Sequence, residues 1–311
     1  MEKRTLGPSG IEVSAVGLGC NNFGGRTDFA GTRATVHKAL DLGVTLFDTA
    51  DAYGNKGGSE EFLGEILGAR RKQVVLATKF GLPMKERGPG GASRAYIMRA
   101  VDASLARLRT DWIDLYQVHY PDAQTPIEET LRALDDLVRQ GKVRAIGCSN
   151  FSATELAAAL DTSARRGLAA FVTCQDEYSL LSRGIEQALI PAIEKRGLNL
   201  LPYFPLASGL LTGKYRRGAP QPQGARLSYS RDHASDVVND RNWALVEKLA
   251  AVAARTGHSL LELAFGWLLA RPAIASVIAG ATRSEQVEYN VAAAARAPAP
   301  AIIAEIDGIT R

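Results

Sequence analysis

The chain has 311 residues, of which 46% are hydrophobic and 23% are charged, and its formal net charge is +4. With 30 glycines, 13 prolines and three cysteines, this composition excludes collagen-like, disordered and disulfide-stapled proteins. Lysines and arginines number 37 against 33 acidic residues, and the two signs are interspersed along the chain. We therefore expect no nucleic-acid partner, whereas phosphate-bearing small molecules remain candidate ligands.

The cysteines and the apolar segments indicate where the protein works. Cys20, Cys148 and Cys174 are far apart in sequence, so we expect no metal site and no disulfide framework. The first ten residues are polar and do not resemble a secretory signal. Charged residues and a proline interrupt the most apolar stretch, 260–281, which excludes a membrane helix there. These features predict a cytoplasmic protein that does not contact a membrane.

Eight short β-branched or apolar runs alternate with stretches of helical periodicity. The expected strands are 13–18, 45–47, 74–77, 113–118, 143–147, 171–174, 198–202 and 274–278. The expected helices between the first seven are 32–42, 60–67, 94–108, 126–140, 154–166 and 185–196. Such alternation predicts βαβ units and a parallel sheet. Eight units without a linker favour one (β/α)₈ TIM barrel domain over residues 1–311, rather than a doubly wound open sheet.

Two segments fall outside the repeating pattern. Residues 4–16 contain a Gly-Pro-Ser-Gly turn, and we expect them to form an N-terminal hairpin that plugs the barrel floor. Residues 208–240 follow the seventh expected strand and form a loop too long for a simple connection. Loops of this length are usually functional, so we expect a lid.

The ends of the expected strands carry polar side chains, and in a parallel barrel these ends form the active site. The residues concerned are Asp48, Lys79, His119, Ser149, Asn150, Gln175 and Tyr203. Taken singly, an Asp there could be a helix cap, a Lys a solvated side chain and a His a structural residue. Their occurrence on successive strand ends instead predicts a reaction site.

Tyr53 lies five residues beyond Asp48, within expected reach of Lys79 and His119. A nearby ammonium favours phenolate, so Lys79 is expected to make the Tyr53 phenol a better proton donor, while Asp48 holds the lysine charge in place. His119 could donate to a substrate oxygen. These groups cannot transfer electrons, so redox chemistry would require a cofactor. The usual GxGxxG signature is missing, so a dinucleotide would have to bind on the barrel rim.

Five segments in the expected order resemble the aldo-keto reductase family. They are GVTLFDTADAYG (43–54), VVLATKF (74–80), residues 117–151, YFPLASGLLTGKY (203–215) and IAGATRSEQVEYN (278–290). The resemblance covers almost the whole chain and implies a barrel that reduces aldehydes or ketones with NADPH, with NADH less favoured. It implies Tyr53 as general acid, Lys79 and Asp48 as its tuning pair, and His119 as the carbonyl-orienting residue. Histidine at position 119 also disfavours steroid double-bond reduction.

The resemblance also assigns the binding residues. Ser149, Asn150 and Gln175 are expected to hold the carboxamide, and Tyr203 to stack on the nicotinamide. The remaining cofactor positions are Gly19, Cys20, Asn21, Asp48, Phe204, Leu206, Ser208, Gly209, Leu210, Lys214, Gly280, Thr282, Arg283, Gln286 and Asn290. Thr282, Arg283 and Ser284 are the expected contacts of a 2′-phosphate, because the Arg283 guanidinium suits phosphate and a helix is expected to begin there.

Aromatic side chains are expected to form the substrate pocket, and two functions other than carbonyl reduction stay open. Phe23, Phe80 and Tyr120 are expected to join Tyr53 and His119 around a small aldehyde or ketone, whose identity the sequence does not give. One alternative is an aldolase in which Lys79 forms a Schiff base. Another is a non-catalytic, nucleotide-sensing subunit like those that accompany potassium channels. The oligomeric state stays open.

Overall fold

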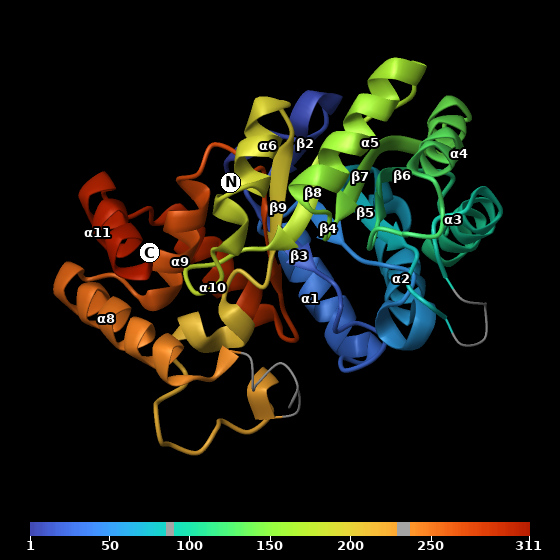
Figure 1. The fold of residues 1–311 in the computed structure, drawn as a ribbon. Helices are drawn as coiled ribbons and strands as arrows, with labels where there is room; N and C mark the ends of the chain where they lie inside the picture. The colour runs from blue at the N-terminus through green and yellow to red at the C-terminus, as the bar shows by residue number, and fades with distance from the viewer. Residues whose placement is uncertain (85–89, 229–236) are drawn as a thin grey trace.

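The computed structural model describes residues 1–84, 90–228 and 237–311, and its centre is an eight-stranded parallel sheet (Figure 1). The strands are adjacent in the order β10-β3-β4-β5-β6-β7-β8-β9. Their bounds are β3 Val16–Gly19, β4 Leu46–Asp48, β5 Val75–Phe80, β6 Ile113–Val118, β7 Val143–Ser149, β8 Phe171–Glu177, β9 Asn199–Tyr203 and β10 Val277–Gly280.

The two edge strands of this sheet meet and close it into a barrel. Leu200 in β9 forms a parallel bridge with Ile274, just before β10. The Leu200 amide donates to the Ala273 carbonyl at 2.7 Å, and the Ala275 amide donates to the Leu200 carbonyl at 3.3 Å. The eighth strand was predicted at 274–278, and the structure uses the start of that segment for closure and the end for β10. The predicted (β/α)₈ barrel is confirmed.

Helices surround the strands on the outside of the barrel (Figure 1). Their bounds are α1 Phe29–Asp41, α2 Tyr53–Leu67, α3 Arg94–Leu108, α4 Ile127–Arg139, α5 Ala153–Arg166, α6 Leu189–Lys195, α8 Asp240–Thr256, α9 Leu260–Leu269, α10 Ser284–Ala295 and α11 Pro300–Thr310. Local sequence sets several of these ends. In α5, Ser152 and Glu155 form a reciprocal capping box and Gly167 ends the helix in the left-handed conformation. Ser259 and Glu262 form the same box at α9.

The N-terminal hairpin closes the floor of the barrel, as predicted. Strands β1 Lys3–Thr5 and β2 Glu12–Ser14 pair antiparallel. Leu6, Ile11 and Val13 from this hairpin are buried in one apolar cluster with residues of the barrel interior such as Leu46 and Leu115. The first expected strand, 13–18, is therefore two strands in the structure, because the chain leaves the hairpin at Ala15 before entering β3.

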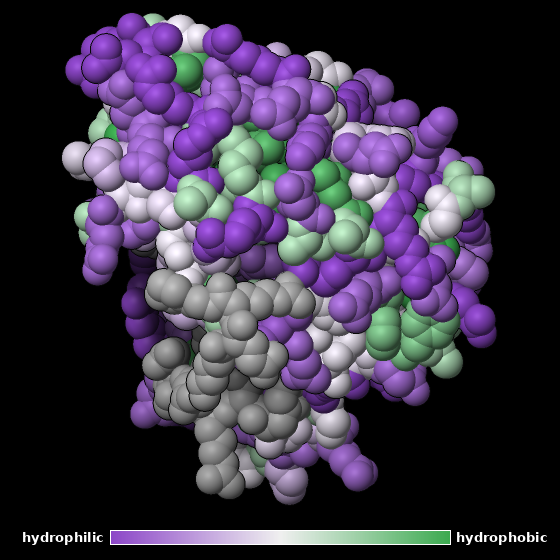
Figure 2. Space-filling model, turned by 90° about the vertical axis from the view of Figure 1, so that its right-hand side faces the viewer, coloured by the Kyte–Doolittle hydropathy of each residue, from purple (hydrophilic) through white to green (hydrophobic). Residues whose placement is uncertain are grey.

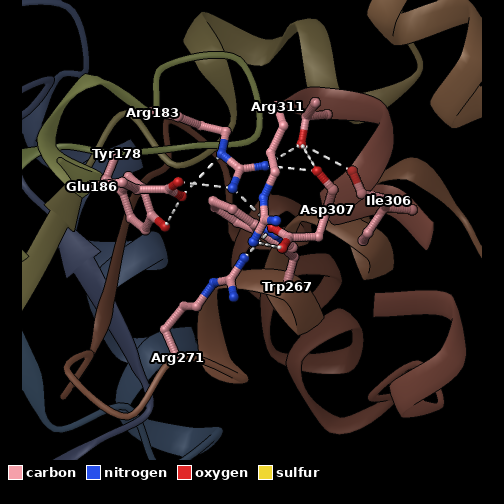
Figure 3. A network of polar contacts seen from close by, with 9 residues as sticks. Tyr178, Arg183, Glu186, Trp267, Arg271, Ile306, Asp307 and Arg311 are labelled. Atoms are coloured by element: carbon pink, nitrogen blue, oxygen red, sulfur yellow. Dashed lines mark hydrogen bonds and ion pairs between the residues drawn. The ribbon is translucent and has the colours of Figure 1, made fainter. Parts of the chain in front are cut away.

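A polar network fastens the C-terminal helix α11 to the barrel (Figure 3). The Asp307 carboxylate accepts a hydrogen bond from Trp267 Nε1 at 3.0 Å and forms ion pairs with Arg183 and Arg271. Arg183 also pairs with Glu186 at 2.8 Å. Both arginines lie over the indole of Trp267, with centroid distances of 5.0 and 4.5 Å. These contacts join α11 to α9 and to the loop after β8.

Figure 2 shows a face on which hydrophilic residues predominate, with hydrophobic side chains in smaller groups between them. No helix within residues 1–84, 90–228 and 237–311 is both long and apolar enough to cross a bilayer.

Candidate active site

The polar strand-end residues gather at one end of the barrel, above its apolar interior. The strand register places Gly19 beside Asp48, Lys79 beside Gln117, and Ser149 beside Gln175. His119 directly follows β6, and its amide donates to the Phe80 carbonyl at 2.9 Å. Strand pairing therefore brings together side chains that are as many as 127 positions apart in sequence, such as Asp48 and Gln175.

Asp48 and Lys79 form a buried ion pair. Lys79 Nζ donates to Asp48 Oδ2 at 2.7 Å and to the Thr49 carbonyl at 2.9 Å. The two side chains are 5% and 1% exposed. Burial lowers the pKa of Lys79, but the Asp48 carboxylate and Tyr53 outweigh this effect, and the pKa is raised overall. The ammonium therefore stays charged beneath Tyr53.

Tyr53 is the first residue of α2, and the four residues that follow it have a left-handed backbone conformation. Residues 54–57 all have positive φ, and Gly54 has φ 66°. A Cβ at Gly54 would lie 2.3 Å from the Phe23 carbonyl oxygen and 2.4 Å from the Ser59 amide, so only glycine fits there. Lys79 Nζ lies 5.0 Å from the centroid of the Tyr53 ring, and the rings of Tyr53 and His119 meet edge to face at 5.7 Å.

The pKa of Tyr53 differs in direction from the sequence-based expectation. Burial raises it, Lys79 lowers it by its charge and by a hydrogen bond, and Asp48 raises it, with a net upward shift. The expected effect of the lysine is present, but desolvation of the phenol exceeds it. In this structure Tyr53 is therefore a protonated phenol at neutral pH, held next to a cation that favours the release of its proton.

His119 is a neutral imidazole. Burial and the charge of Lys79 lower its pKa from 6.5 to about 3. Its ring stacks on that of Tyr120 at 5.4 Å. A neutral imidazole carries one N–H donor and one acceptor nitrogen, so His119 can orient a carbonyl oxygen without supplying a charge.

Asn150 links two neighbouring side chains and one backbone carbonyl of the rim. Its Nδ2 donates to the His119 carbonyl at 2.9 Å and to Ser149 Oγ at 3.0 Å. Its Oδ1 accepts from the Tyr203 hydroxyl at 2.8 Å. Asn150 adopts the left-handed conformation, with φ 61°, which asparagine tolerates better than most residues. The orientation of the Tyr203 ring thus depends on Asn150.

A cavity of about 1010 Å³ opens over these residues. Among the expected positions, it is lined by Gly19, Cys20, Asn21, Asp48, Tyr53, His119, Tyr120, Ser149, Asn150, Gln175, Tyr203, Phe204, Leu206, Ser208, Gly209, Lys214, Gly280, Thr282, Arg283, Gln286 and Asn290. Tyr53, His119 and residues of α10 all contribute to its wall. The side-chain oxygen of Gln286, Oε1, already accepts a hydrogen bond from the Thr282 backbone amide at 2.7 Å. The side-chain nitrogen of Gln286, Nε2, is therefore the group available to a ligand.

Three of the expected ligand contacts do not line the cavity, because their side chains are buried in the protein core. Phe80 follows the inward-facing Lys79 in β5, so it faces the opposite side and packs on Tyr116, with ring centroids 4.8 Å apart. Phe23 and Leu210 are also fully buried. All three belong to the large apolar cluster of the core and do not line the cavity.

Comparison with known proteins places this site in a family. A family model described as the Aldo/keto reductase family matches residues 15–311. The chain belongs to the aldo/keto reductase family. L-glyceraldehyde 3-phosphate reductase of Escherichia coli is 34% identical to it, over 94% of this chain and 87% of that protein. The holo form of aldo-keto reductase AKR11C1 from Bacillus halodurans covers 100% of this chain and 97% of its own, at TM-score 0.84 and 32% identity.

A relative with a different name is also similar over almost its whole length. A probable voltage-gated potassium channel subunit beta of Oryza sativa subsp. japonica is 34% identical, over 100% of this chain and 97% of that protein. The family and the reductases in it identify this aldo/keto reductase as an oxidoreductase that acts on carbonyl compounds. The aldolase alternative requires a neutral amine, and the raised pKa of Lys79 argues against it.

Several cavity residues of this aldo/keto reductase were not predicted from its sequence. Arg26 comes from the loop after β3, and Arg226 from the described part of the predicted lid, whose residues 229–236 lie outside the described structure. The whole segment Pro222–Arg226 forms part of the cavity wall. Glu177 and Tyr289 line the cavity as well, and the only available signal was their position beside Gln175 and Asn290.

Proposed function

We propose that this chain reduces an aldehyde or ketone to an alcohol, with NADPH as the hydride donor and Tyr53 as the proton donor. The observation that supports this most directly is that the Tyr53 ring contacts both Lys79 and the neutral His119, and that Tyr53 and His119 line the cavity. The substrate oxygen would be protonated by Tyr53 and oriented by His119. Lys79, held by Asp48, would stabilise the phenolate that remains.

The cavity fits a phosphorylated dinucleotide. Its volume, about 1010 Å³, suits a large ligand. Ser208 Oγ is buried at its wall and has no hydrogen-bond partner within the described residues, so it is available to a ligand. Arg26, Lys214, Arg226 and Arg283 all line it. Burial and then Arg26 and Arg283 lower the pKa of Lys214, which shows how closely these cations are placed. An anionic ligand relieves that repulsion.

We assign the two ends of the cofactor by the groups that face them. Ser149, Asn150 and Gln175 would hold the carboxamide at the catalytic end, with Tyr203 against the ring. Lys214 and its neighbouring segment 206–214 would bind the pyrophosphate. Bound in this way, NADPH supplies the hydride that the side chains cannot. Gln175 Nε2 already donates to Asp48 at 2.9 Å, so its carbonyl oxygen is the atom left for the carboxamide.

A titration of the purified protein with NADPH and, separately, with NADH tests this assignment. Quenching of the intrinsic tryptophan and tyrosine fluorescence reports binding. We expect NADPH to bind much more tightly than NADH, because Arg283 at the start of α10 would bind the 2′-phosphate. Equal binding of the two nucleotides would contradict the contact between Arg283 and the 2′-phosphate, but it would be consistent with the proposed reductase activity. A protein that binds neither would contradict the cofactor assignment.

The rice and Arabidopsis relatives named as probable potassium channel β subunits support a second candidate. In that case the chain would bind the nucleotide and act as a partner subunit with slow turnover. A panel of small aldehydes separates the two functions. Rapid NADPH oxidation supports the reductase, and uniformly slow turnover with tight NADPH binding supports the partner role. Because the three cysteines are free and buried, we propose the cytoplasm as the location in either case.

A further inference from the structure

The Asp48 carboxylate accepts hydrogen bonds from three neighbouring side chains of the barrel. Lys79 occupies Oδ2, and two amides share Oδ1: Gln175 Nε2 at 2.9 Å and Gln117 Nε2 at 3.3 Å. Gln175 lines the cavity, whereas Gln117 is fully buried and does not. Gln117 therefore does not reach a ligand in the cavity, and its hydrogen bond to Asp48 connects it to the proposed catalytic residues.

The neighbouring strand leaves room for this glutamine. Gln117 in β6 pairs with Gly147 in β7. A Cβ at Gly147 would lie 3.2 Å from Gln117 Cγ and 2.5 Å from Thr173 Oγ1. Any larger residue at position 147 would thus displace the Gln117 side chain or its neighbour. Glycine at position 147 therefore leaves the space that the Gln117 side chain occupies as it extends toward Asp48.

Burying the side-chain amide of Gln117 lowers the stability of the folded protein, because one of its polar atoms has no partner. Its Oε1 is buried and has no hydrogen-bond partner within the described residues. An apolar side chain of the same shape would avoid this unsatisfied acceptor. Turning the amide over would place an oxygen against the carboxylate, so the observed orientation is the favourable one. The N–H donated to Asp48 is the interaction gained by having glutamine here.

We propose that Gln117 is a positioning residue that holds the Asp48 carboxylate and reduces the negative charge felt by Tyr53. The inference rests on the proposed function of Tyr53 as proton donor. Lys79 favours proton release from Tyr53 and Asp48 opposes it. The amide N–H of Gln117 offsets part of the charge on Oδ1. Without it, Asp48 makes Tyr53 a weaker acid.

Gln117→Met tests this directly, because methionine keeps the length of the side chain and removes the donor. We expect kcat to fall about tenfold, with the Kd for NADPH unchanged. Thr173→Val is the matched control. Thr173 is fully buried beside Gly147, and its Oγ1 has no partner in the described part of the chain. It should keep the wild-type kcat.

Gln117→Glu gives a pH-dependent readout that a merely structural role would not. The introduced carboxyl faces Asp48, and this like-charge contact raises its pKa. At low pH it is protonated and can donate to Asp48, so kcat should rise toward the wild-type value as the pH falls. A structural defect would give a loss relative to wild type that stays constant with pH.

A double-mutant cycle completes the test. In the Tyr53→Phe background, Gln117→Met should cause no further loss of rate, because its effect acts through the phenol. An equal tenfold loss in that background, or wild-type kcat in Gln117→Met alone, would overturn the inference. A wild-type protein that turns over no carbonyl substrate would instead refute the proposed function, and this inference with it.

Discussion

The Tyr203 hydroxyl donates to Asn150 Oδ1 at 2.8 Å, and the same asparagine donates to the His119 carbonyl at 2.9 Å. One side chain thus connects the ring of Tyr203, which is proposed to contact the nicotinamide, with the backbone of His119, which is proposed to orient the carbonyl. The link fixes the relative placement of the two proposed ligand contacts.

Removing the Tyr203 hydroxyl tests this link. Tyr203→Phe keeps the ring but frees it from Asn150, so the ring is less well oriented before NADPH binds. We expect the Kd for NADPH to rise about threefold to tenfold, in line with one neutral hydrogen bond. Tyr203→Ala serves as the comparison and should weaken binding further, because the stacking face is lost as well. Equal Kd values for Tyr203→Phe and the wild type would contradict the orienting role.

The low pKa of His119 predicts a pH profile. Because burial and Lys79 lower it to about 3, His119 stays neutral over the usual assay range. The kcat/KM profile of the wild type should therefore show no inflection near the ordinary histidine pKa of 6.5. An inflection there that disappears in His119→Asn would contradict the neutral imidazole.

The lowered pKa of His119 also makes the stability of the fold depend on pH in a defined direction. Its folded pKa lies below its unfolded value, so its contribution is complete above about pH 6.5 and is lost as the pH falls toward about 3. Measuring Tm for the wild type and His119→Asn across this range checks the sign. The stability advantage of the wild type should shrink as the solution becomes more acidic.

Arg283 carries the expected preference for NADPH. Arg283→Ala should raise the Kd for NADPH about tenfold or more and leave that for NADH unchanged, because only NADPH has the 2′-phosphate. Arg99→Ala, which removes an exposed arginine on α3 outside the cavity, is the matched control. A parallel weakening of both nucleotides by Arg283→Ala would place the arginine against a phosphate that they share.

Asp176 is predicted to destabilise the protein at high pH. Burial raises its pKa to about 6, although the Glu177 amide donates to its Oδ1 at 2.8 Å. A raised folded pKa means that stability present below about pH 4 is lost as the pH rises through about 6. Asp176→Asn should raise Tm by about 2 °C near pH 8, after allowance for partial exposure, and leave it unchanged near pH 4. A lower Tm near pH 8 would reverse the sign.

The barrel and the polar residues on its rim could be predicted from the sequence for a physical reason. Parallel strands are buried on both faces and appear as short apolar runs, so a polar residue at the end of such a run is conspicuous. Asp48, Lys79 and His119 were found in this way. The strand ends were less exact because β2 and β3 are separated by a single residue, Ala15, and read as one run.

Other features required the folded chain. Phe80 was assigned to the pocket, but strand alternation turns it away from the side on which Lys79 lies. Arg26 and Arg226 reach the cavity from loops whose paths no periodicity encodes. The upward net shift in the pKa of Tyr53 depends on how deeply the fold buries the phenol, which local sequence does not specify.

The most direct test of the account compares NADPH oxidation by the wild type and Tyr53→Phe with a reactive aldehyde, followed by the loss of NADPH absorbance. The account predicts one alcohol formed per NADPH consumed by the wild type. It also predicts a rate about 10² to 10⁴ lower for Tyr53→Phe, with an unchanged Kd for NADPH, because only the proton donor is lost. A Tyr53→Phe protein that reduces the aldehyde at the wild-type rate would contradict the central claim.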